Sequence, residues 1–272
     1  MKITALTENI SGNEKVEPEH GLSLYIETEK HTVLFDTGAS GVFLKNAAVL
    51  GKDMSSVDTV VISHGHYDHG GGIEKFIQIN KTAPVYINKG AFDDIYRVAP
   101  GGEKYIGLDK RISEEGSIVK LEGNIIIDEE LSIFSGVKER KLWPSGNKKM
   151  RIKEDGVFRR DEFLHEQNLV VNNKKTVLFA GCSHNGAVNI AEEFIRLYGK
   201  PADVFVGGFH FKRDGDYTES DLKLIRDTAK YFKRFPTMFY TCHCTGIEPY
   251  EEMKKIMGGQ LEYIKCGDEI EI

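Results

Sequence analysis

Hydrophobic and polar positions follow two periods along this chain of 272 residues. Short apolar or alternating runs, bounded by Gly, Asp, Asn and Ser, indicate strands. In the first half these runs are 2–6, 22–27, 31–36, 58–63, 84–87, 117–121, 124–128 and 131–134. In the second half they are 168–171, 176–181, 203–208 and 237–241.

Longer stretches with apolar residues three or four positions apart separate these strands and predict helices. They cover 42–50, 73–79, 91–97, 187–198, 219–233 and 249–257. Alternating strands and helices favour an α/β layered fold. Since no fixed-period repeat or low-complexity linker interrupts the pattern, we expect a single domain over residues 1–272.

Composition narrows the functional class. Lys and Arg number 36 against 42 Asp and Glu, a net charge of −6, which argues against a nucleic-acid partner. No apolar run approaches the roughly 18 residues of a membrane span, and no basic-then-apolar signal region opens the chain. We therefore expect a cytoplasmic protein without a membrane partner. The four cysteines, the first at Cys182, are expected to be reduced thiols.

One segment, 138–160, departs from this acidic balance. It carries nine Lys or Arg against three acidic residues, a local charge of +6, and the only tryptophan, Trp143. Two interpretations remain open for this insertion: a solvated loop, or a lid over an anionic substrate.

The densest chemical signal follows the strand at 58–63 directly. The sequence HGHYDHGGG begins there and places His64, His66, Asp68 and His69 within six positions. Imidazoles at i and i+2 of a tight turn can converge on one cation, while a carboxylate and an imidazole at i+4 and i+5 face a second one. The spacing thus predicts two adjacent divalent metal ions. Neutral imidazole and carboxylate oxygen suit zinc best, although iron and manganese accept similar ligands.

Together with VLFDTG upstream and VLFAGCSH and TCHCTG downstream, this motif resembles the metallo-β-lactamase superfamily. The resemblance covers almost the whole chain. It implies a four-layer αββα sandwich with a dinuclear metal site at one edge of the two sheets. More narrowly, HGHYDHGGG, GCSHNGAVNI, GGFHF and HCTG resemble the branch of 7,8-dihydropterin-6-methyl-4-(β-ribofuranosyl)aminobenzene 5'-phosphate synthases.

The resemblance assigns roles residue by residue. His64 and His66 match ligands of the first metal, and Asp68, His69 and His243 match ligands of the second. Asp36 matches an aspartate that orients the metal site without binding the metal.

The last ligand of the first metal stays open, because the chain departs here from the superfamily pattern. The strand 176–181 is followed by Cys182 where the superfamily has a bridging aspartate, and His184 comes two positions later. One alignment takes His165 as the third imidazole, as in class B β-lactamases. We prefer His184, because GCSH is the motif of the narrower branch.

Two more residues are catalytic candidates. Asp68 lies at the expected metal pair, and His210, after the strand at 203–208, is either a core histidine or a general acid or phosphate contact near the metals. Cys242 and Cys244 are expected to be buried thiols rather than a metal-binding pair.

The function implied by the resemblance is a hydrolase-type enzyme that uses a metal-activated water on a small anionic substrate, possessing a phosphate or a pterin-like ring in the narrower branch. Within enzymes, a β-lactamase or thioester hydrolase is the alternative. From another class, a metal-bound redox or sensor protein stays open, because cysteines neighbour the imidazoles.

Overall fold

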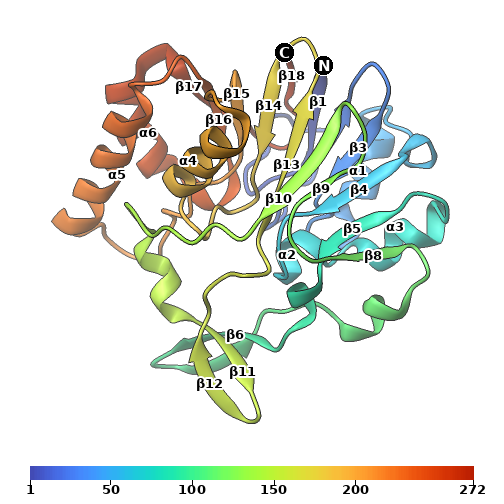
Figure 1. Ribbon diagram of the computed structural model, residues 1–272, viewed down its shortest axis with the longest axis horizontal. Helices are drawn as coiled ribbons and strands as arrows, with labels where there is room; N and C mark the ends of the chain where they lie inside the picture. The colour runs from blue at the N-terminus through green and yellow to red at the C-terminus, as the bar shows by residue number, and fades with distance from the viewer.

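The computed structural model describes residues 1–272 and is built around two seven-stranded sheets (Figure 1). The first sheet has the order β18 (Glu269–Glu271), β1 (Lys2–Thr7), β2 (Ser23–Glu27), β3 (Thr32–Phe35), β4 (Thr59–Ile62), β5 (Val85–Asn88) and β8 (Ile118–Leu121). The second has the order β17 (Leu261–Tyr263), β16 (Met238–Thr241), β15 (Val204–Val206), β14 (Thr176–Phe179), β13 (Gln167–Asn172), β10 (Leu131–Ser135) and β9 (Ile125–Ile126).

The central core lies between the two sheets. Phe35 on β3 and Phe179 on β14 meet there with ring centroids 5.9 Å apart, and both are fully buried. Removing this apolar surface from water on both sides of each strand explains why the strand sequences read as continuous apolar runs.

Helices cover the outer face of each sheet (Figure 1). On the first sheet, Phe43 of α1 (Val42–Val49) and Phe76 of α3 (Ile73–Ile79) pack with Val60 of β4. On the second sheet, α4 (Ala187–Tyr198), α5 (Glu219–Phe232) and α6 (Ile247–Met257) bury a cluster rich in phenylalanine. The prediction of a four-layer αββα sandwich is confirmed.

A third, four-stranded sheet lies below the sandwich in Figure 1, in the order β12 (Val157–Arg160), β11 (Met150–Glu154), β6 (Ile95–Ala99) and β7 (Gly102–Tyr105). Its β6 corrects the predicted helix at 91–97, which is wrong: Ile95 is buried and Tyr96 packs against Phe158 at 5.3 Å, so pairing with β11 outweighs the local helical spacing.

The same sheet also corrects the description of 138–160 as a loop. The segment forms a 3-10 turn, η4 (Ser145–Lys149), and the hairpin β11–β12. The alternation of apolar and polar residues expected of a strand is hard to see in this hairpin, because basic side chains take part in its packing. Lys153, for example, places its ammonium 4.8 Å from the centre of the Phe158 ring.

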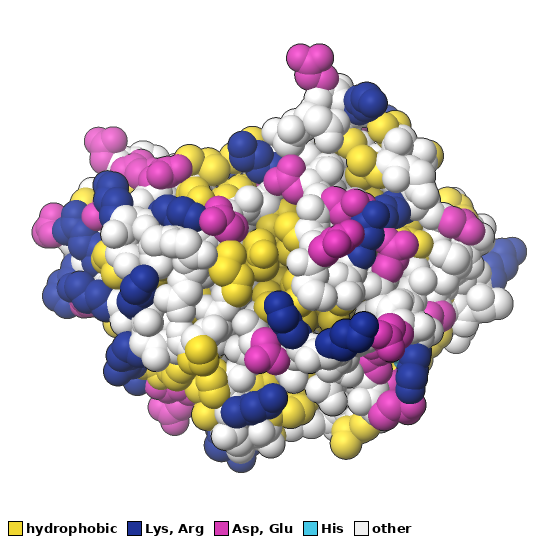
Figure 2. Space-filling view, turned by 90° about the horizontal axis from the view of Figure 1, so that it is seen from above, with side chains coloured by type: hydrophobic (Ala, Val, Ile, Leu, Met, Phe, Trp, Pro, Cys, Tyr) yellow, Lys and Arg dark blue, Asp and Glu magenta, His cyan; other side chains and the backbone are white.

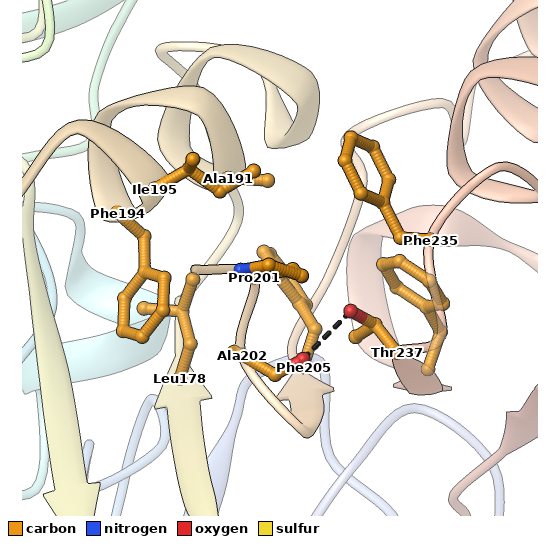
Figure 3. Close-up of a pocket in the computed structure, with 10 residues that line it drawn as sticks. Leu178, Ala191, Phe194, Ile195, Pro201, Ala202, Phe205, Phe235 and Thr237 are labelled. Atoms are coloured by element: carbon orange, nitrogen blue, oxygen red, sulfur yellow. Dashed lines mark hydrogen bonds between the residues drawn. The ribbon is translucent and has the colours of Figure 1, made fainter. Parts of the chain in front are cut away.

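A small apolar pocket between α4 and the second sheet is lined by residues such as Phe194 and Phe205. Next to them, Thr237 Oγ1 donates a hydrogen bond to the Ala202 carbonyl at 2.7 Å (Figure 3). On the face where both termini lie, acidic and basic side chains intermingle and no histidine is visible (Figure 2). No helix has the length and apolar character needed to cross a membrane.

Candidate metal centre

The predicted ligands gather at one edge of the sandwich because they follow parallel strands. In the first sheet β3, β4 and β5 are parallel, and in the second β14, β15 and β16 are parallel, so their carboxyl ends share an edge. All six predicted metal ligands lie there and are at most 7% exposed: His64, His66, Asp68, His69, His184 and His243.

Three imidazoles form the first group. His64 Nε2 and His66 Nδ1 face each other at 3.0 Å, and one nitrogen each of His64, His66 and His184 lie within 4.8 Å of one another. Ring nitrogens on one tetrahedral zinc lie roughly 3.3 Å apart, given Zn–N distances near 2.05 Å. The spacing of this group therefore fits a single cation.

The protonation of these rings also fits a cation. Burial lowers the pKa of His64 and His184 well below the usual value and lowers the pKa of His66 to about 3. At neutral pH the rings are uncharged and offer lone pairs. The Nε2 atom of His184 is buried without any hydrogen-bond partner, which is costly unless a ligand satisfies it.

Asp36 contacts His69 directly and reaches His64 through Ser63. Its Oδ2 accepts hydrogen bonds from His69 Nδ1 at 2.6 Å and from Ser63 Oγ at 2.7 Å, and Ser63 Oγ lies 2.9 Å from His64 Nδ1. A donating Ser63 hydroxyl can accept only from His64 Nδ1–H, so this chain of bonds places a proton on Nδ1 of both His64 and His69. Although burial alone would lower the pKa of His69, the Asp36 carboxylate outweighs it and raises the pKa to about 9.

The second group comprises the remaining predicted ligands. His243 Nε2 lies 3.4 Å from Asp68 Oδ2, and the His243 and His69 rings are 5.0 Å apart. Cys182 Sγ lies 3.1 Å from His69 Nε2 and within 4.8 Å of a His64 nitrogen. The thiol thus occupies the position between the two groups where a bridging carboxylate was expected from the superfamily pattern.

His165 is buried beside the first group, but both of its nitrogens have partners. Nδ1 accepts the Gly65 N–H at 3.1 Å, and Nε2 donates to Asp161 Oδ2 at 3.2 Å. Although burial alone would lower the pKa of His165, Asp161 outweighs it and raises the pKa. Because the Nδ1 lone pair accepts from Gly65 and the Nε2–H donates to Asp161, the contacts of His165 are those of a residue that supports the HGH turn.

His210 lies at the rim. Its ring centroid is 4.1 Å from that of His184, and its buried Nδ1 has no hydrogen-bond partner. The residue has φ 53°, in the left-handed region that non-glycine residues adopt infrequently. Cys242 and Cys244 are buried and free, as expected.

Sequence patterns missed His20, which precedes β2 and belongs to no motif. Its half-exposed imidazole places Nε2 3.3 Å from Asp68 Oδ2, and its ring lies 5.2 Å from that of His243. Only an isolated histidine marks it in the sequence, so no local signal could have identified it.

The basic segment contacts the first group. Trp143 Nε1 donates to the His184 carbonyl at 2.8 Å, and Arg160 stacks over the Trp143 ring at 4.3 Å. Gly146 lies so close to His210 that a Cβ atom there would be 3.3 Å from Nε2. The segment therefore forms one wall of the candidate centre.

Comparisons with known proteins agree with this geometry. The model of the metallo-beta-lactamase superfamily matches residues 16–163. An uncharacterized protein of Methanocaldococcus jannaschii is 29% identical over 93% of this chain and 94% of its own length. The 7,8-dihydropterin-6-methyl-4-(beta-D-ribofuranosyl)-aminobenzene-5'-phosphate synthase of the same organism is 29% identical over 91% of this chain and 88% of its own.

Among solved structures, Tm1679, described as a metal-dependent hydrolase of the beta-lactamase superfamily, is 32% identical. The match covers 100% of this chain and 99% of that one, with a TM-score of 0.84.

Proposed function

Because this chain belongs to the metallo-beta-lactamase superfamily, we propose that it is a metal-dependent enzyme of the hydrolase type with a dinuclear, preferably zinc, centre. The observation that carries the proposal is the clustering of buried ring nitrogens of His64, His66 and His184 within 4.8 Å of one another, among which His184 Nε2 has no hydrogen-bond partner. Without a ligand, several buried ring nitrogens of this cluster would stay unsatisfied.

The residues that would hold the metals follow from the two groups. His64, His66 and His184 would bind the first ion. Asp68, His69 and His243 would bind the second, with Cys182 at the position between them. When bound, such a pair supplies Lewis-acid polarisation and lowers the pKa of a water.

The protein side chains then have separable tasks. Asp68 lies where it can orient a nucleophile, since its Oδ2 already faces His20 and His243. His210 at the rim can give a proton to a leaving group or hold a phosphate. Trp143, whose Nε1 donates to the His184 carbonyl, attaches the basic segment to the first group.

We propose a small anionic substrate, phosphorylated or pterin-like. Two observations support it: the local charge of +6 in 138–160, which lies against the centre, and similarity to a relative whose printed name is a dihydropterin aminobenzene phosphate synthase. Arg and Lys side chains are suited to phosphate recognition.

The experiment that tests the function combines metal analysis with a substrate panel. The purified protein is expected to carry one to two divalent ions per chain, to lose activity on chelation and to regain it on adding Zn²⁺. The panel contains bis(p-nitrophenyl) phosphate, a thioester, a β-lactam, and a dihydropterin with a ribofuranosylaminobenzene phosphate. A folded sample without metal would refute the proposal, and bound iron with no turnover would favour a redox protein.

A prediction on substrate binding concerns Lys149, which is exposed at the end of η4. Lys149→Met keeps the aliphatic stem and removes the charge. We expect KM for an anionic substrate to rise at least about tenfold with kcat nearly unchanged, because a charge-assisted contact contributes about 1.5–3 kcal/mol. Steady-state kinetics measure both values.

Lys174→Met is the matched control, since Lys174 lies in the turn between β13 and β14, at the opposite end of the strand that leads to Cys182. Arg151 is less suitable, because its Nη1 donates to the Lys148 and Met150 carbonyls and holds the turn. An unchanged KM in Lys149→Met would favour the other interpretation of 138–160, a solvated segment without a role in substrate binding.

A further inference from the structure

Asn147, in the basic segment, holds His184 at two points. Its Oδ1 lies 2.8 Å from His184 Nδ1, and its Nδ2 donates to the His184 carbonyl at 2.7 Å. An amide nitrogen can face a carbonyl only as a donor, so the amide cannot be turned around. Oδ1 must therefore accept a hydrogen bond from Nδ1–H, which leaves Nε2 of the neutral ring without a proton.

Asn9, two residues after the end of β1, holds His243 in the same way. Its Oδ1 lies 2.9 Å from His243 Nδ1, and its Nδ2 donates to the His243 carbonyl at 3.2 Å. Again the two contacts fix the amide orientation and place the ring proton on Nδ1. The Nε2 atom of His243 is buried and makes no hydrogen bond, and its polar neighbour is Asp68 Oδ2, another predicted ligand, 3.4 Å away.

A buried glutamate completes each arrangement. The His184 N–H donates to Glu166 Oε1 at 2.6 Å, and the His243 N–H donates to Glu8 Oε1 at 2.6 Å. Both carboxylates are at most 1% exposed. Each histidine is thus fixed at its backbone N–H, its carbonyl and its ring.

We propose that Asn147 and Asn9 are positioning residues, one for each metal, that select the Nδ1–H tautomer of His184 and His243 and so prepare Nε2 as the ligand atom. The inference rests on the proposed metal centre and extends it to two residues outside every motif. The ring nitrogen that carries the proton is set by the partner of the other nitrogen, and loss of such a partner typically weakens metal binding by about 10–100-fold.

Asn9 and Asn147 come from different parts of the fold. Asn9 belongs to the sandwich, whereas Asn147 belongs to the segment that also carries Lys149 and Trp143. The packing of the segment 138–160 against the centre therefore orients His184 of the first metal site. In this proposal the same segment orients a metal ligand and contacts the substrate.

The test compares Asn147→Leu and Asn9→Leu, which keep the side-chain shape but remove both contacts. In the metal-free wild type, ¹⁵N NMR of the imidazoles should show a protonated Nδ1 and a bare Nε2 on His184 and His243. Asn147→Leu should abolish this single tautomer at His184 only, and Asn9→Leu at His243 only. Zn²⁺ titration against a chromophoric chelator should show about 10–100-fold weaker binding at the corresponding site.

Two further variants separate positioning from folding. Asn147→Asp keeps an acceptor for Nδ1–H and should retain more Zn²⁺ affinity than Asn147→Leu. Asn80→Leu is the matched control, because the buried Asn80 amide donates to the Met54 and Val57 carbonyls away from the centre. It should lower the free energy of unfolding without changing either tautomer or the metal affinity.

The outcomes are distinct. A wild-type protein that binds no Zn²⁺ although its rings show the expected tautomers would overturn the proposed metal centre, and the inference with it. Metal binding that is equally tight in the wild type and both Leu variants, or a protonated Nε2 in the metal-free wild type, would overturn the positioning role alone.

Discussion

His66→Ala is expected to empty the first metal site while the chain still folds. The substitution removes one of three imidazoles, and two remaining nitrogens do not meet the three protein ligands typical of a catalytic zinc. Activity should fall by more than the roughly 10–100-fold that follows loss of a residue that only orients a ligand. Metal analysis and kinetics on the same preparation measure both effects.

Asp68→Ala is the companion change at the second site. It should weaken binding of the second ion and leave the first ion in place, because Asp68 lies next to His243 and His20 and is not one of the three residues of the first group. His31→Ala is the matched control: this imidazole is paired with Asp58 and Asp128 and lies outside both groups. Unfolding of either site variant, or full metal content in His66→Ala, would contradict the assignment.

The second large effect separates His184 from His165. His184→Ala should lose the first metal, because it removes the buried Nε2 that has no other partner. His165→Ala should keep its metal content but lose about 1–3 kcal/mol of unfolding free energy, because Gly65 N–H and the buried Asp161 lose a partner. Metal stoichiometry and denaturant unfolding of the two variants, prepared identically, give the comparison.

The reverse result has a clear meaning. If only His165→Ala loses metal, the ligand assignment of the first site is wrong. Cys182, 3.1 Å from His69 Nε2, then becomes the principal candidate for the second ion, as in the class B alignment. Cys182→Ser would test that directly, since a hydroxyl keeps the size but not the affinity of sulfur for soft metals.

Much of the centre could be predicted from sequence because its parts are local. His64, His66, Asp68 and His69 lie within one turn after a buried strand, and the layered alternation of strands and helices carries that turn to a sheet edge. His243 was predicted from the resemblance of TCHCTG to a superfamily motif, and it lies at the same edge because carboxyl ends of parallel strands meet there.

Other features depended on contacts between residues far apart in the chain. Tyr96 and Phe158 pack across β6 and β11–β12, so the strand replaced the helix that local spacing favoured. The basic residues of the hairpin hid its alternation, because their aliphatic stems pack while their charges reach water.

The sequence by itself determined the layers, the edge and the residue types gathered at it, because hydrophobic periodicity and motif spacing are local properties. Only the tertiary structure decided which imidazole nitrogens are free. His165 is closed by Gly65 and Asp161, while His184 is held open by Asn147, 37 positions away, and His243 by Asn9, 234 positions away. A ring nitrogen's role depends on what its other nitrogen contacts, and that contact exists only after distant segments have packed.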